Sequence, residues 1–212
     1  NAKDVTIKSK ANLNAEGKVN VNASNDTSID NSTLTSSADM VEINSGNDTN
    51  VVKSTLKANK NVNLTSTKNT TIDNSNLKSE TSQIVAKSSD AKINGSTLTS
   101  KNATLISGKN SLNVDGSKLT SSNTQVKLTS NNDVTLNNST VNAKTIATVE
   151  SKKANATINN SSINAGEINV AAAKAATVDA SNLAATGADS QININAKDVT
   201  IKSKANLNAE GK

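Results

Sequence analysis

The chain has 212 residues, of which 33% are hydrophobic, and it contains no Phe, Tyr, Trp, Pro, Cys or His. These absences exclude an aromatic core, a disulfide framework, an imidazole base, a thiolate nucleophile and a zinc site of the usual kind. The net charge is only +5, and the 23 basic residues are all lysines interspersed with acids and Asn, which indicates a solvated surface and neither nucleic-acid binding nor membrane insertion.

A short motif recurs along the whole chain: a small residue, then any residue, then an aliphatic one. Successive copies begin 20 to 24 residues apart, and a repeat of this length is typical of solenoids, propellers and arrays. The motif occurs, in chain order, at Ala11-Asn12-Leu13, Ser32-Thr33-Leu34, Ser54-Thr55-Leu56, Ser75-Asn76-Leu77, Ser96-Thr97-Leu98, Ser117-Lys118-Leu119, Ser139-Thr140-Val141, Ser161-Ser162-Ile163, Ser181-Asn182-Leu183 and Ala205-Asn206-Leu207.

Within each repeat, apolar or small residues alternate with polar ones in three short bursts. In the repeat that begins at Ser54 they are Leu56, Ala58, Val62, Leu64, Ser66, Thr70 and Ile72. Alternation with a period of two predicts β-strands, and 21 residues leave no room for helices. We therefore predict an all-β fold, a right-handed parallel β-helix (β-solenoid) of triangular coils with three short strands each, because parallel crossovers are right-handed.

The alternation predicts which side chains fill the bore of the β-solenoid and which form its corners. The expected core residues are Leu13, Val19, Val21, Ile29, Leu34, Leu56, Val62, Leu64, Ile72, Leu77, Leu98, Leu119, Leu136, Ile158, Ile163 and Leu183. The expected corner residues tolerate a left-handed backbone, and they are Asn31, Asn74, Gly95, Gly116, Asn138 and Asn160. Two corners depart from this chemistry, at Val52-Lys53 and Asp179-Ala180. The strand register loosens at Gln83-Ile84-Val85 and at Thr104-Leu105-Ile106.

A longer repeat is superimposed on the short one. The segment NAKDVTIKSKANLNAEGK at residues 1–18 recurs unchanged at residues 195–212. We therefore expect residues 1–212 to form one continuous β-solenoid segment, in which residues 1–194 are one tandem unit of nine coils and residues 195–212 begin the next. An engineered duplication is the alternative. Because neither end carries a capping element, the expected partners are further copies of the chain, covalent in tandem or stacked end to end.

The S-x-L-x-[AS] start, the V-x-L-x-S middle and the V-x-I-[DN]-[NG] close of each coil resemble the haemagglutinin-type repeats of filamentous exoproteins exported by two-partner secretion. That family includes filamentous haemagglutinins, high-molecular-weight adhesins and contact-dependent inhibition proteins. The resemblance implies a protein that is secreted or held at the bacterial cell surface. It implies a structural shaft that supports adhesion, a biofilm matrix or the display of a distal tip, with receptor contacts through regions outside this sequence.

Other functions are weighed against this one. Asp26, Asp48 and Asp133 lie near corners, but the GGxGxD pattern of calcium-binding solenoids is absent, so we expect no metal and no cofactor. Without Arg or aromatic subsites, a carbohydrate-active β-helix enzyme is disfavoured, and we assign no catalytic residue.

An ice-binding β-solenoid is the remaining alternative, although lysines interrupt its Thr-x-Thr columns. Some relatives are glycosylated at N-x-[ST], a tripeptide that chance alone makes frequent in a chain with 36 Asn.

Overall fold

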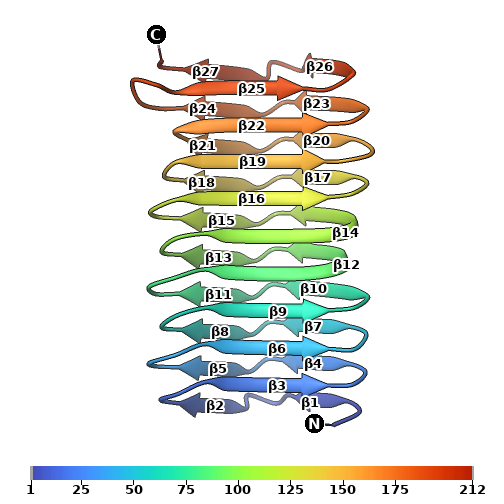
Figure 1. Cartoon of the computed structure of the whole chain (residues 1–212), viewed down its shortest axis with the longest axis vertical. Helices are drawn as coiled ribbons and strands as arrows, with labels where there is room; N and C mark the ends of the chain where they lie inside the picture. The colour runs from blue at the N-terminus through green and yellow to red at the C-terminus, as the bar shows by residue number, and fades with distance from the viewer. Residues whose placement is uncertain (1, 212) are drawn as a thin grey trace.

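The computed structural model describes residues 2–211 and shows a single column of stacked coils (Figure 1). Residues 1 and 212, the outermost positions of the predicted units, lie outside the described residues. In Figure 1 the strands nearest the viewer run from left to right and the chain returns behind them while it rises toward the C-terminus, which is a right-handed winding. Residues 2–211 contain 27 strands and no helix, so they include no helix that could cross a membrane.

Each coil contributes one strand to a ten-stranded parallel sheet, which we call the first face. Its neighbours pair in register, so Leu34 lies over Leu13 and under Leu56 along the column. The strands of the first face are β2 (Asn12–Ala15), β5 (Thr33–Ser36), β8 (Thr55–Ala58), β11 (Asn76–Ser79), β13 (Thr97–Ser100), β15 (Lys118–Ser121), β18 (Thr140–Ala143), β21 (Ser162–Ala165), β24 (Asn182–Ala185) and β27 (Asn206–Ala209).

The other two faces are also parallel stacks, joined into one 17-stranded sheet. The second face contains β3 (Val19–Ala23), β6 (Val41–Ser45), β9 (Val62–Ser66), β16 (Gln125–Ser130), β19 (Ile146–Ser151), β22 (Glu167–Ala172) and β25 (Gln191–Asn195). The third face contains β1 (Val5–Ile7), β4 (Thr27–Asp30), β7 (Thr49–Val52), β10 (Asn69–Asp73), β17 (Val134–Asn137), β20 (Ala156–Asn159), β23 (Ala175–Asp179) and β26 (Asp198–Lys202).

Two coils depart from the expected three strands. In them the second and third strands are continuous, as β12 (Ile84–Asn94) and β14 (Thr104–Asp115), and these long strands join the two faces. The pairing between them shifts register between Ser88 and Asp90. The corner of β14 is one residue longer, because six positions separate Ile106 from Leu112 whereas five separate Ala86 from Ala91. A β-bulge accommodates the extra residue.

The loosened segments keep the register of their neighbours. Ile84 pairs with Val62 on one side and with Thr104 on the other, and all three side chains are buried. Val85 and Leu105 alternate outward and are half-buried. Strand pairing above and below thus determines which side of these ambiguous segments faces the bore.

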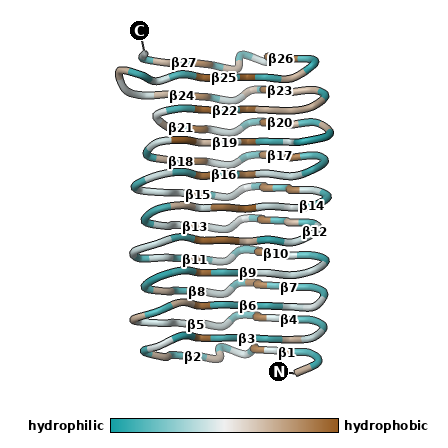
Figure 2. Tube along the Cα trace, in the orientation of Figure 1, coloured by the Kyte–Doolittle hydropathy of each residue, from teal (hydrophilic) through white to brown (hydrophobic). Residues whose placement is uncertain are grey.

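The core is one continuous apolar cluster along the column, and Figure 2 shows hydrophobic positions recurring at the same place on each turn. The predicted core residues found buried are Val19, Val21, Ile29, Leu34, Leu56, Val62, Leu64, Ile72, Leu77, Leu98, Leu119, Leu136, Ile158, Ile163 and Leu183. Leu13 was also predicted to be buried, and this is wrong, because it is 36% exposed. It lies in the first coil, where no described coil covers its lower side.

Candidate functional site

The third corner, between the third and first faces, holds a column of buried serines. Each hydroxyl donates to the carbonyl two residues earlier, at 2.5–2.8 Å, and from Ser54 onward each also accepts the backbone N–H of the serine in the preceding coil, at 3.0–3.1 Å. The members are Ser32, Ser54, Ser75, Ser96, Ser117, Ser139, Ser161 and Ser181. Ala11 and Ala205 stand at the equivalent positions of the end coils, so this serine ladder stops one coil short of each end.

The residue before each ladder position has a left-handed backbone, with φ between 45° and 61°. The predicted corner residues Asn31, Asn74, Gly95, Gly116, Asn138 and Asn160 all have this conformation. Lys10, Lys53, Ala180 and Lys204 share it although their side chains do not favour it. The stacking of coils therefore dictates the backbone at this corner, and the residue type follows it in most coils but not in all.

The second corner, between the second and third faces, carries a column of Asp and Asn. The Oδ1 of Asp4 accepts the N–H of Asp26 at 3.2 Å, Asp26 accepts that of Asp48 at 3.1 Å, and Asp48 accepts that of Asn69 at 3.0 Å. Asp133 receives both the backbone N–H and the side-chain amide of Asn155 at 3.1 Å. These carboxylates therefore satisfy the backbone of the next coil.

The same bonds change the acidity of the first carboxylate in this column. The side-chain amide of Asn25 and the backbone N–H of Asp26 hold the pKa of Asp4 below its ordinary value. Asp26 and Asp48 stack in one column, and Asp133 belongs to a coil farther along the chain. Among residues 2–211 no group of three or more acidic, His or Cys side chains could hold a metal ion.

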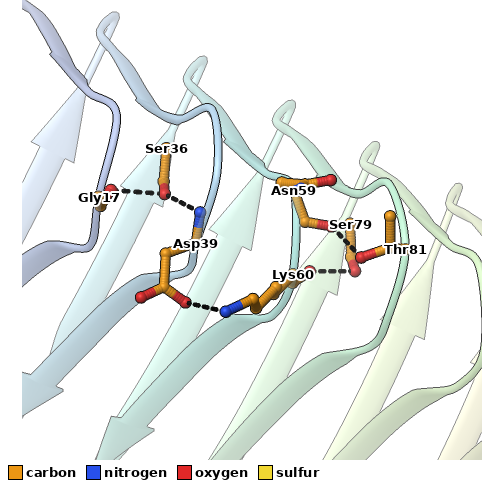
Figure 3. A network of polar contacts seen from close by, with 7 residues as sticks. All are labelled: Gly17, Ser36, Asp39, Asn59, Lys60, Ser79 and Thr81. Atoms are coloured by element: carbon orange, nitrogen blue, oxygen red, sulfur yellow. Dashed lines mark hydrogen bonds and ion pairs between the residues drawn. The ribbon is translucent and has the colours of Figure 1, made fainter.

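The first corner, between the first and second faces, is held by links between neighbouring coils (Figure 3). The Ser36 hydroxyl donates to the Gly17 carbonyl at 2.6 Å and accepts the N–H of Asp39 at 3.1 Å. The Asp39 carboxylate pairs with the Lys60 ammonium at 3.4 Å, and Ser79 donates to the carbonyl of Lys60. These contacts join the first corner of one coil to the first corner of the next, so the corners are stacked like the strands.

Two ion-pair groups on the surface also join coils. Glu80 lies 2.9 Å from Lys78 and 3.2 Å from Lys57, and the hydrogen bond from Lys78, followed by that from Lys57, lowers the pKa of Glu80. The Ser203 hydroxyl and then the Lys202 ammonium, 3.2 Å away, lower the pKa of Asp179. Both groups are solvent-exposed, so they contribute to the alignment of coils more than to their free energy of unfolding.

The outward side chains of the first face form a polar surface without a continuous threonine lattice. Thr33 and Thr35 are followed in the next coils by Lys57 and Lys78 at the second outward position. Lys118 interrupts the first outward position farther along. A charged side chain within a threonine column disturbs a flat match to ice, so no observation here favours an ice-binding surface.

The two ends differ from the rest of the column. At the C-terminal end Val199 and Ile201 are 48% and 50% exposed, and at the N-terminal end Leu13 borders a shallow hollow with Asn12, Asn14 and Ala15. The strands of these end coils have no described neighbour on their outer side.

Sequence reasoning missed the serine ladder as a distinct element, although the small residue that opens each repeat was its signal. Comparison of the chain with protein-family models, with curated proteins and with solved structures gave no match. The functional argument therefore depends on the geometry of the column and of its ends.

Proposed function

We propose that the chain is a structural segment of an extracellular bacterial fibre, a shaft that supports adhesion, a biofilm matrix or a distal tip. The observation that carries this proposal is the uninterrupted column itself: every described coil pairs with its neighbour through parallel strands, and polar side chains at the corners join the same coils. The residues act through geometry. Parallel strand ladders run along the column on all three faces, and such a rigid column suits a load-bearing rod.

The repeated end segment supports continuation of the rod. The two end coils, residues 2–17 and 196–211, have the same sequence and are covered on opposite sides, and a coil within tandem units would be covered on both. At about 4.8 Å per coil, nine coils extend the shaft by roughly 43 Å per unit. Residence outside the cell is proposed from the resemblance of the coil motif to haemagglutinin-type repeats, and an export route without disulfides suits a chain that has no cysteine.

Location on the producing cell tests this function. A short epitope inserted at the second corner, between Asn131 and Asn132, lies outside both neighbouring strands, because β16 ends at Ser130 and β17 begins at Val134. Antibody labelling of intact cells is expected to decorate filaments outside the envelope, and protease added to intact cells is expected to remove the label. Labelling only after permeabilisation would contradict the proposal.

A further inference from the structure

The same coil occurs at both ends of the chain with opposite sides covered. At the N-terminal end, β1 and β2 pack against β4 and β5, and their other side is open. At the C-terminal end, β26 and β27 pack against β23 and β24, and again the other side is open. One amino-acid sequence is therefore seen to fit two different neighbours.

The register of the two fits is the same. Ile7 pairs with Ile29, and its counterpart Ile201 pairs with Val178. Leu13 likewise pairs with Leu34, whereas Leu207 pairs with Leu183. Each inward side chain of this coil can thus lie between two apolar partners, one from the end of a unit and one from its beginning.

We propose that the C-terminal coil, residues 196–211, of one molecule docks on β4 and β5 of a second copy and replaces that copy's own residues 2–17. This inference rests on the proposed fibre and specifies its joint. In the joined state Val199 lies opposite Thr27, Ile201 opposite Ile29 and Leu207 opposite Leu34, since the identical N-terminal residues make these pairings within one chain.

Charge favours this register over simple stacking of one end on the other. Simple stacking places identical coils against each other, so Lys202 would face Lys8 and Lys204 would face Lys10. In the exchanged register Lys202 takes the place of Lys8, and the Ile7–Ile29 pairing, continued by one residue, places it beside Asp30 and away from a second lysine. Like charges on adjacent strands oppose pairing, whereas opposite charges support it.

The exchange conserves the contacts that it breaks. Residues 2–17 lose their pairing with β4 and β5, and an identical segment restores the same pairings from another molecule. Val199 and Ile201, which are half-exposed in the separate chain, then take the positions that Val5 and Ile7 hold against β4. The released segment has only one covered side, which makes it the coil that is easiest to displace.

Cross-linking tests the proposal, because the chain contains no native cysteine. The variant Thr33→Cys with Asn206→Cys places one thiol on β5 and one on β27. Eight coil steps, about 38 Å, separate them within a molecule, whereas the exchanged joint places them on adjacent strands within disulfide reach. Oxidation of the purified full chain is expected to give a ladder of covalent oligomers on a denaturing gel.

Two results would overturn the exchanged joint. If Asn12→Cys with Asn206→Cys forms the ladder while Thr33→Cys with Asn206→Cys stays monomeric, identical ends stack directly. If neither variant forms oligomers, the ends do not dock. As a matched control, Thr140→Cys with Asn206→Cys is expected to stay monomeric, because Thr140 lies in β18, well inside the column and away from both ends. Neither failure changes where intact cells display the protein, so the proposed function is tested separately.

Discussion

Residues at the third corner hold a backbone conformation that their side chains do not always favour. A left-handed backbone costs an L-residue with a Cβ atom roughly 1–2 kcal/mol, and Gly or Asn avoids much of that cost. Ala180 has φ 45° and Lys53 has φ 47°, so these positions carry strain that the glycines at the equivalent positions 95 and 116 do not.

Ala180→Gly is expected to stabilise the protein by about 1 kcal/mol, because relief of the strained φ exceeds the greater entropy of glycine in the unfolded chain. Urea unfolding followed by circular dichroism measures the change. Ala184→Gly, in the neighbouring strand β24, is the matched control and is expected to destabilise by about 0.5–1 kcal/mol. Equal destabilisation by both changes would contradict this account of the corner.

Burial decides the effect of a charge in β9. The Leu64 side chain is 0% exposed, and Leu64→Asp places a carboxylate among aliphatic side chains without a partner. We expect a loss of several kcal/mol or failure to fold. Thr65→Asp changes the next residue, which points outward, and is expected to cost under about 1 kcal/mol. Comparable melting temperatures for the two variants would show that the inward and outward assignments are wrong.

At the scale of the element, the serine ladder adds hydrogen bonds between coils at the third corner, beside the apolar core. Ser96→Ala removes the acceptor of the Ser75 N–H and the donor to the Asn94 carbonyl in a buried place. The expected loss is about 1–3 kcal/mol, since buried groups are left unpaired. Denaturant unfolding compares it with Ser37→Ala, an exposed serine expected to change stability by under about 0.5 kcal/mol. An equally small loss for Ser96→Ala would contradict the role of the ladder.

Carboxylates that are hydrogen-bonded or ion-paired to a neighbouring coil give the column an acid-sensitive component. Glu80, Asp179 and Asp4 have pKa values lowered by their partners in the folded state. Their contribution is complete above the unfolded pKa, about 4, and disappears as the pH falls through the lower folded pKa. The melting temperature is therefore expected to fall on acidification below about pH 4. The triple variant Asp4→Asn, Glu80→Gln, Asp179→Asn is expected to lose less over that range, and an identical decline would contradict the assignment.

The sequence predicts the repeating element well, because each coil depends mainly on the alternation of its own residues. Ile29, Leu56 and Leu119 are buried where that alternation places them. What one coil cannot predict depends on its neighbours. Leu13 has the pattern of a core residue and lacks a covering coil, and the register shift between β12 and β14 appears only where a longer corner lies against a shorter one. The serine ladder needs the spatial alignment of eight coils before its bonds exist.

At the scale of the whole molecule, the column combines a narrow apolar bore with polar ladders at all three corners. An aromatic core is unnecessary, because each coil encloses little volume and stacks its aliphatic residues over those of the next. Stability then grows by addition of neighbouring coils, and the length of the chain converts directly into the length of a rod. This linear relation between residues and length is the property that a shaft requires.

The length of tandem proteins tests that relation most directly. Proteins with one, two and three copies of the 194-residue unit are to be compared by electron microscopy and small-angle X-ray scattering. We predict straight rods of constant width whose length increases by about 43 Å for each added unit, as nine coils of roughly 4.8 Å require. Compact particles that grow in all three dimensions, or flexible chains without a constant width, would contradict the account.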